Sequence, residues 1–134
     1  MRLKAEGRPD AVDGNSLANV ITGNTGNNTL AGLGGADTLI GDAGTDTPSY
    51  AASAAGVNVS LMTGVAQGGD AEGDTFSSIE GPLGSAQNDT LEGDGGNNVL
   101  NGGAGIDTLN AFCGQLMSQV VIKRSPGCTY RTET

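Results

Sequence analysis

Oxygen-bearing side chains recur in this sequence at a spacing that suits metal binding. They occupy the sixth position of nine-residue units, and the eight of them are Asn19, Asn28, Asp37, Asp46, Asp74, Asp89, Asn98 and Asp107. Carboxylate and carboxamide oxygens bind hard cations, and calcium accepts about six to eight of them in irregular geometry, whereas magnesium demands a tight octahedron. Histidine is absent and both cysteines lie outside the units, which argues against zinc or copper.

The units that position these residues are nonapeptides that begin with glycine. The first block, residues 14–49, reads GNSLANVIT, GNTGNNTLA, GLGGADTLI and GDAGTDTPS. The second block, residues 84–110, reads GSAQNDTLE, GDGGNNVLN and GGAGIDTLN, and a weaker unit, GDAEGDTFS, covers residues 69–77. The first six residues of a unit predict a tight turn, in which glycine supplies positive φ and close backbone approach. The last three residues predict a very short strand.

Position 8 of each unit is the side chain expected to point inward, because alternate residues of a strand face opposite sides. These residues are Ile21, Leu30, Leu39, Pro48, Phe76, Leu91, Leu100 and Leu109. One inward residue in nine predicts a thin core. A flexible linker would not keep an aliphatic residue at a fixed offset from an Asp or Asn, so the linker interpretation is disfavoured. Pro48 lacks an N–H for a sheet, and we expect it to end the first block.

The stretch between the blocks, residues 50–83, departs from the nine-residue rule. Val57 to Leu61 alternates as a half-buried strand does, and a turn then leads into a second short strand, Val65 to Gln67. We interpret the stretch as a β-hairpin-like insertion lying against the repeats. A further inserted strand is expected through Phe76 and Ile79.

The two ends of the chain lack the glycine-led repeat. Residues 1–13 are interpreted as an N-terminal extension. Residues 111–134 form a basic, non-repeat tail that contains Cys113 and Cys128. This tail is expected to lie outside the repeat fold, either as a disordered segment or as the product of a shifted reading frame, with a strand over residues 115–123 as an alternative.

Charge is distributed very unevenly along the chain. No Lys or Arg lies between Pro9 and Ile122, yet of the 15 acidic residues only Glu6 and Glu133 fall outside that stretch. Such a surface repels nucleic acid and anionic lipid and attracts hard cations. No apolar run approaches the roughly 18 residues that would predict membrane insertion, and the first residues lack the apolar run of a secretory signal.

The units resemble the RTX, or hemolysin-type calcium-binding, nonapeptide GGxGxDxUx, in which U is a large aliphatic residue; GLGGADTLI and GGAGIDTLN match it best. The resemblance implies an all-β fold, a right-handed parallel β-roll (a β-solenoid) with two nonapeptides per turn. It further implies calcium between stacked turns, held by position-6 side chains from units i and i+2 and by backbone carbonyls. The implied pairs are Asn19 with Asp37, Asn28 with Asp46, and Asp89 with Asp107, whereas Asn98 has no partner and the asparagine sites are weaker.

The resemblance also implies a function. We expect a calcium-binding module that folds only when calcium is present, because the bare chain lacks a core and its carboxylates repel one another. The family's usual setting suggests a fragment of a larger secreted bacterial protein, exported to the extracellular space by type I secretion machinery, whose catalytic or adhesive domain lies outside this chain.

Two other functions are considered beside calcium binding. Catalysis is disfavoured because the sequence contains no H-E-x-x-H, G-x-S-x-G or P-loop motif. The acidic cluster Asp70, Glu72 and Asp74 is interpreted as an extra calcium site or a solvated turn rather than a catalytic pair. A surface-binding solenoid is the alternative, with ice suggested by threonine at position 7 and polysaccharide disfavoured by the lack of Lys and Arg in the repeats.

Overall fold

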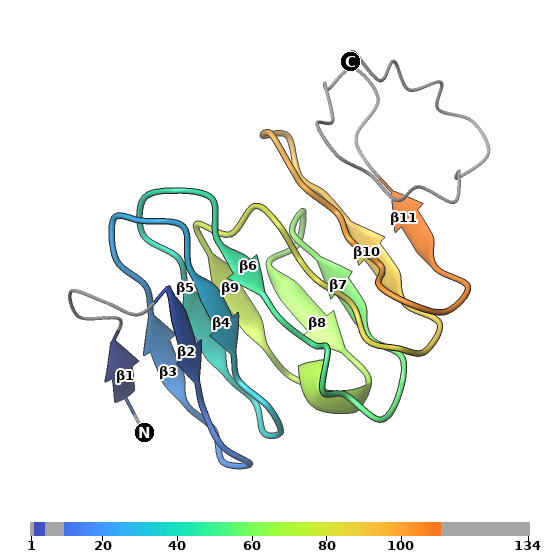
Figure 1. Cartoon of the computed structure of the whole chain (residues 1–134), viewed down its shortest axis with the longest axis horizontal. Helices are drawn as coiled ribbons and strands as arrows, with labels where there is room; N and C mark the ends of the chain where they lie inside the picture. The colour runs from blue at the N-terminus through green and yellow to red at the C-terminus, as the bar shows by residue number, and fades with distance from the viewer. Residues whose placement is uncertain (1, 5–9, 111–134) are drawn as a thin grey trace.

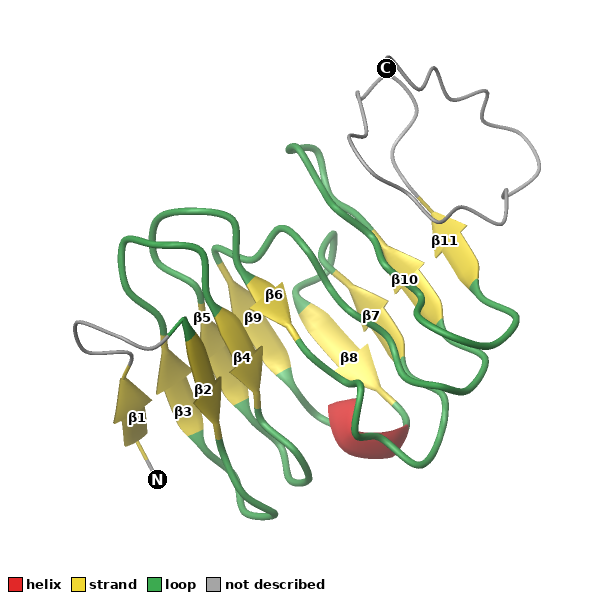
Figure 2. Ribbon diagram, in the orientation of Figure 1, coloured by secondary structure: helices red, strands yellow, loops and turns green. Residues whose placement is uncertain are grey.

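The chain folds into two facing sheets of very short strands. The computed structural model describes residues 2–4 and 10–110, and none of their helical segments is long and apolar enough to cross a membrane. In spatial order the larger sheet contains β1 (Arg2–Lys4), β3 (Val20–Thr22), β5 (Thr38–Ile40), β9 (Thr75–Ser77), β8 (Val65–Gln67), β7 (Asn58–Ser60), β10 (Thr90–Glu92) and β11 (Thr108–Asn110) (Figure 1). The smaller sheet contains β2 (Ala11–Asp13), β4 (Thr29–Ala31) and β6 (Thr47–Pro48). A single 3-10 turn, η1 (Gly69–Ala71), is the helical element in the described residues (Figure 2).

The strands of each block stack in parallel, every second unit on the same sheet. Ile21 pairs with Leu39 in the larger sheet, and Leu30 pairs with Pro48 in the smaller one. In the second block Leu91 of β10 pairs with Leu109 of β11. Two nonapeptides therefore complete one turn of a parallel β-solenoid, which confirms the predicted fold class.

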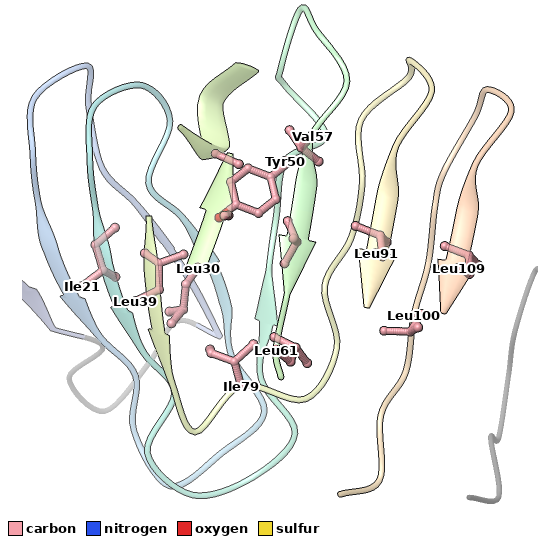
Figure 3. Packing of buried hydrophobic residues seen from close by; sticks show 13 residues of the cluster. Ile21, Leu30, Leu39, Tyr50, Val57, Leu61, Ile79, Leu91, Leu100 and Leu109 are labelled. Atoms are coloured by element: carbon pink, nitrogen blue, oxygen red, sulfur yellow. The ribbon is translucent and has the colours of Figure 1, made fainter. Parts of the chain in front are cut away.

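The core lies between the sheets and is larger than the repeats alone would make it. The aliphatic residues at position 8 are buried, with exposed fractions of 2 % or less for Ile21, Leu30, Leu39, Leu91, Leu100 and Leu109. The stretch between the blocks adds Tyr50, Val57, Val59 and Ile79 to the same cluster (Figure 3). Phe76, in contrast, is only partly buried. The expectation of one inward residue in nine thus holds for the blocks but underestimates the whole core.

The insertion is part of the larger sheet. β7 and β8 form the predicted antiparallel hairpin, with Val59 opposite Ala66. β9 pairs in parallel with β5 of the first block, and β7 pairs in parallel with β10 of the second. The three strands therefore lie between the blocks in the reverse of their sequence order and join them into one sheet. The hairpin therefore lies beside the repeats within the sheet: β7 pairs directly with the second block, and β8 is linked to the first block through β9.

Pro48 does not interrupt the smaller sheet. Its carbonyl oxygen accepts a hydrogen bond from the N–H of Leu83 at 3.0 Å, and Ser49 bridges in parallel to Leu83, which bridges in turn to Asn101. Proline removes one donor from a ladder but leaves its carbonyl free to accept. The ladder of the first block therefore continues into the second, beyond the point where Pro48 was expected to end it.

The N-terminal extension adds a further turn to the solenoid. Leu3 of β1 pairs with Ile21, and Val12 of β2 pairs with Leu30. Both residues are partly buried and pack against the core. Counting back in nines from Ile21 and Leu30 reaches them, so the repeat frame extends toward the N-terminus without its glycines.

Glycine is required at position 1 because a side chain would not fit there. Positive φ was expected in these turns, and it occurs at other positions, such as 103° at Gly35 and 120° at Gly44, but not at Gly23 or Gly41. A methyl group built on Gly23 would overlap the side-chain oxygen of Asn28 and the carbonyl oxygen of Gly41 in the next turn. Position 1 is therefore the point where neighbouring turns approach too closely for a side chain.

This packing predicts opposite outcomes for two glycine substitutions. Gly23→Ala should destabilise the folded chain by about 1–3 kcal/mol, because a backbone carbonyl must move. Gly95→Ala should be neutral or stabilise by up to about 1 kcal/mol, because nothing lies within 4 Å of its added methyl group. Thermal melts in calcium would measure both, and equal melting temperatures for the two variants would contradict this account.

Candidate metal site

The candidate ligands stand at the end of each turn, immediately before the strand. Seven of the predicted residues are buried, with exposed fractions of 5 % or less: Asn19, Asn28, Asp37, Asp46, Asp74, Asp89 and Asn98. Asp107, in the outermost described turn, is partly exposed. Burial of a polar side chain is costly unless it finds a partner, so each of these residues must be satisfied by the protein, by a proton or by a cation.

One hydrogen bond recurs between stacked turns. The position-6 carboxylate of one turn accepts the backbone N–H of the position-6 residue one turn earlier. The N–O distances are 2.8 Å from Asn19 to Asp37, 2.8 Å from Asn28 to Asp46 and 3.0 Å from Asp89 to Asp107. The structure thus brings together all three pairs that the family resemblance implied.

The series that begins with Asn19 and Asp37, here called the first edge, ends on a tyrosine. The N–H of Asp37 donates to Oδ1 of Asp74 at 2.7 Å, and the hydroxyl of Tyr50 donates to Oδ2 of Asp74 at 2.7 Å. Both oxygens of Asp74 therefore have protein donors. Burial of Asp74 raises the pKa of its carboxyl group from 3.8 to about 6 despite these two hydrogen bonds.

Turns that end in asparagine are closed by their own side chains. In each, Oδ1 of the asparagine accepts the position-2 N–H, and Nδ2 donates to Oδ1 of the position-2 side chain. The pairs are Asn15 with Asn19, Asn24 with Asn28, and Asp94 with Asn98. The oxygen and the amide nitrogen of each asparagine thus have partners inside the turn. Asn98 forms this closed turn too, although the pairing implied by the resemblance gave it no partner.

Turns that end in Asp37 and Asp46 remain open. Each aspartate uses Oδ1 for the inter-turn hydrogen bond, while its Oδ2 is buried and has no hydrogen-bond partner. Position 2 of these turns adopts positive φ, 67° at Leu33 and 77° at Asp42. Non-glycine residues rarely adopt this conformation, so the open turn is itself strained. Two buried carboxylate oxygens are therefore left for a ligand from outside the chain.

The electrostatics of these two aspartates favour a cation. Burial raises the pKa of Asp37 and of Asp46, and the nearby charge of Asp42 raises that of Asp46 further. Between Pro9 and Ile122 the sequence offers no Lys or Arg to neutralise them. A buried carboxylate without a counter-charge takes up a proton or binds a metal ion.

The second block contains one turn of a mixed kind. Asp89 accepts the N–H of Ser85 on Oδ2 and the Ser85 hydroxyl on Oδ1, and Oδ1 also accepts the N–H of Val57. The turn of Asp107 instead has glycine at positive φ in positions 2 and 4, 75° at Gly103 and 116° at Gly105. Its backbone matches the open turns of the first block, without their strain.

The prediction from the repeats missed two acidic residues in frame. Glu80 accepts the N–H of Asp46 on Oε2 at 2.9 Å, the role that Asp46 plays for Asn28. Asp10 lies one turn before Asn28, and its carbonyl accepts the N–H of Thr29. Glu80 is nine residues before Asp89, and Asp10 is nine before Asn19. Extending the frame where glycine is absent would have found both.

A calcium ion fits the open turns. Calcium needs oxygen ligands, and the buried Oδ2 atoms of Asp37 and Asp46 are oxygens without partners. A methyl group on Gly41 would overlap both Oδ2 of Asp46 and the carbonyl oxygen of Ser78, so a backbone carbonyl points into the same space. In the described part of the chain no three acidic, histidine or cysteine side chains meet at one point. A bound ion would therefore draw on carbonyl oxygens as well as carboxylates.

Comparison with known proteins agrees with this chemistry. Residues 13–48 and 83–109 match the model of the RTX calcium-binding nonapeptide repeat, in four copies. No curated protein matches the chain. The matched ranges contain the open turns of Asp37 and Asp46 and exclude most of the insertion.

The raised pKa of Asp74 predicts how pH affects the calcium-free chain. A carboxyl group that binds its proton more tightly when folded stabilises the fold at low pH, and that contribution is lost as pH rises from 3.8 to about 6. In calcium-free buffer, β-structure measured by circular dichroism should therefore increase when pH falls from 7 to about 5. Asp74→Asn should make this dependence shallower, and an unchanged profile would contradict the assignment.

Proposed function

Because its two repeat blocks belong to the RTX calcium-binding nonapeptide family, we propose that this chain is a module whose folding is coupled to calcium binding. It is a calcium-binding repeat module with a β-roll fold. The coupling of folding to calcium binding is the part that we propose. A chain whose folded state buries unpaired carboxylates is destabilised without a counter-ion, so an ion that binds only the folded state shifts the equilibrium toward it.

A single observation carries this proposal. Oδ2 of Asp37 and Oδ2 of Asp46 are buried without a partner, in a stretch that contains no basic residue. Leaving a buried carboxylate oxygen without a partner destabilises the folded state more than leaving a neutral polar group unpaired, commonly by more than about 3 kcal/mol. Two such atoms consume a large part of the roughly 5–15 kcal/mol by which domains are stable.

The open turns are the sites that we assign first. Asp37 and Asp46 offer free buried oxygens, and Asp107, paired with Asp89, has the same turn backbone. The other predicted ligands, Asn19, Asn28, Asp74 and Asn98, have protein partners and would contribute through weaker sites. Calcium supplies the positive charge, and the chain supplies oxygens held in place by the turns.

The biological setting extends the same argument. RTX repeats occur in secreted bacterial proteins. A chain that folds only in calcium stays unfolded in calcium-poor cytosol and folds after export. We infer that it is a fragment of a larger extracellular protein that leaves the cell by type I secretion, and that catalytic or adhesive activity belongs to other parts of that protein.

The alternative of an ice-binding surface gains no support from the outward face of the larger sheet. Along one row the paired outward residues are Val20, Thr38, Thr75 and Val65. Thr38 and Thr75 share a hydrogen bond at 3.3 Å, but the row is not a continuous threonine ladder. We therefore keep calcium-dependent folding as the proposed function.

Circular dichroism with and without calcium tests the proposal directly. We expect little regular structure in excess chelator at pH 7 and β-rich structure in millimolar calcium, with magnesium a poor substitute because its octahedral shell is rigid. Identical spectra in both conditions at low salt would overturn the coupling of folding to calcium.

Two aspartate variants separate a ligand from a general acidic surface. Asp37→Asn keeps an acceptor for the N–H of Asn19 but removes the charge and the free oxygen, so calcium affinity should fall by at least about tenfold, or about 1.4 kcal/mol. Asp42→Asn removes the same charge from an exposed position-2 side chain and should have a small, salt-screened effect. Calorimetric calcium titration measures both, and equal losses would show that the ligand positions are wrong.

A further inference from the structure

Asn101 and Gly102 form the single Asn-Gly step in the sequence, at the point where one repeat ends and the next begins. Glycine is required at position 102, because a methyl group there would overlap the side chain of Asp107. Asparagine is not required before it, since other units end in Thr22 or Ala31. The step therefore places a side-chain amide beside a peptide nitrogen that no neighbouring β-carbon shields.

Asparagine is a chemically labile residue, and before glycine it can lose its side-chain amide in water without a catalyst. The Gly102 nitrogen gives its proton to hydroxide and attacks Cγ of Asn101. As the new N–C bond closes a succinimide ring, the Cγ–Nδ2 bond breaks and ammonia leaves with a proton taken from water. Water then opens the ring at one of its two carbonyl carbons. Breaking the new N–C bond leaves an aspartate, whereas breaking the original peptide bond leaves an isoaspartate, whose main chain runs through Cβ and Cγ.

The folded chain restrains the groups that this reaction must move. The N–H of Asn101 donates to the carbonyl of Pro82 at 3.1 Å, and the N–H of Gly84 donates to the carbonyl of Asn101 at 2.8 Å. The side-chain Oδ1 of Asn101 accepts the N–H of Gly103 at 3.0 Å, and Gly102 is buried. Ring closure turns the peptide between residues 101 and 102 about the Cα–C bond of Asn101, so the hydrogen bond from Gly84 must first break.

We propose that Asn101 is a site of spontaneous deamidation and isoaspartate formation, protected while the chain is folded with calcium and reactive when calcium is removed. The inference rests on the proposed function in one respect, that folding requires calcium. In the folded state only those molecules react in which the 101–102 step is locally open, so the stability of the last turns sets the rate. The modification therefore accumulates with the time that a chain spends without calcium.

The isoaspartate product prevents the last turn from stacking. It lengthens the main chain immediately before turn 102–107, where the packing leaves no spare room, since a methyl group on Gly103 would overlap the carbonyl oxygen of Ser85. The displaced turn loses the hydrogen bond that the N–H of Asp89 donates to the carboxylate of Asp107 at 3.0 Å. A chain that is modified without calcium therefore refolds without β11 in its place.

Peptide mapping by mass spectrometry tests where and when the amide is lost. The full chain is incubated at mildly alkaline pH in millimolar calcium or in excess chelator, with Asn15, which precedes a serine, as the internal control. We expect deamidation of Asn101 to be at least about tenfold faster in chelator than in calcium, and faster than that of Asn15. Equal rates at Asn101 in a chain that folds with calcium by circular dichroism, or no deamidation in chelator, would overturn the proposal. Identical circular dichroism in the two buffers would instead overturn the proposed function.

Amide hydrogen exchange tests the consequence for the last turn. The N–H of Thr108 donates to the carbonyl of Asp89 at 2.8 Å, and the N–H of Thr38 donates in the same way to that of Asn19 at 2.9 Å in the first block. In calcium, the purified isoaspartate form should lose protection at Thr108 and keep it at Thr38. Asn101→Asp adds the same negative charge without lengthening the main chain, so it should keep protection at both. Full protection of Thr108 in the isoaspartate form, or its loss in Asn101→Asp, would contradict the effect on the last turn.

Discussion

The structure depends on one hydrogen bond, donated by a backbone N–H of one turn to a carboxylate of the next. The N–H of Asn28 donates to the Asp46 carboxylate, and the N–H of Asp46 donates in the same way to the Glu80 carboxylate. This bond fixes the spacing of the turns, and it places the carboxylate inside the molecule. The second carboxylate oxygen comes with it, so the interaction that stacks the turns also creates the buried negative charge. The calcium dependence that we propose follows from how the turns are joined.

The turns differ in whether the second polar atom of the turn-ending side chain has a partner in the protein. Asn28 closes its turn with its own amide, Asp74 accepts the hydroxyl of Tyr50, and Asp46 has no protein donor for its second oxygen. Where asparagine ends a turn, its amide nitrogen is a neutral group that donates a hydrogen bond within the turn. Where Asp37 or Asp46 ends a turn, the equivalent atom is a carboxylate oxygen that a cation can bind. Under the proposed function, the need for calcium scales with the number of open aspartate turns rather than with the number of repeats.

Much of the repeat architecture was predictable because it is local and periodic. The nine-residue frame fixes which residue of each unit faces inward, and it places Asp37 one turn beyond Asn19. The strand order of the insertion was not predictable in the same way. Alternation identified β7 and β8, but the pairing of β9 with β5 joins segments far apart in sequence, which no local pattern encodes.

The missed site residues have a related physical cause. The search for units relied on glycine at position 1, and glycine is needed there only where a neighbouring turn approaches closely. At the junction Ser78 replaces glycine with φ of 53°, and the turn contracts to end on Glu80. What persists is the carboxylate that accepts the N–H of the preceding turn. Since that hydrogen bond joins the turns even where the glycine pattern is lost, the position of an in-frame acidic residue is the more dependable guide to where the solenoid continues.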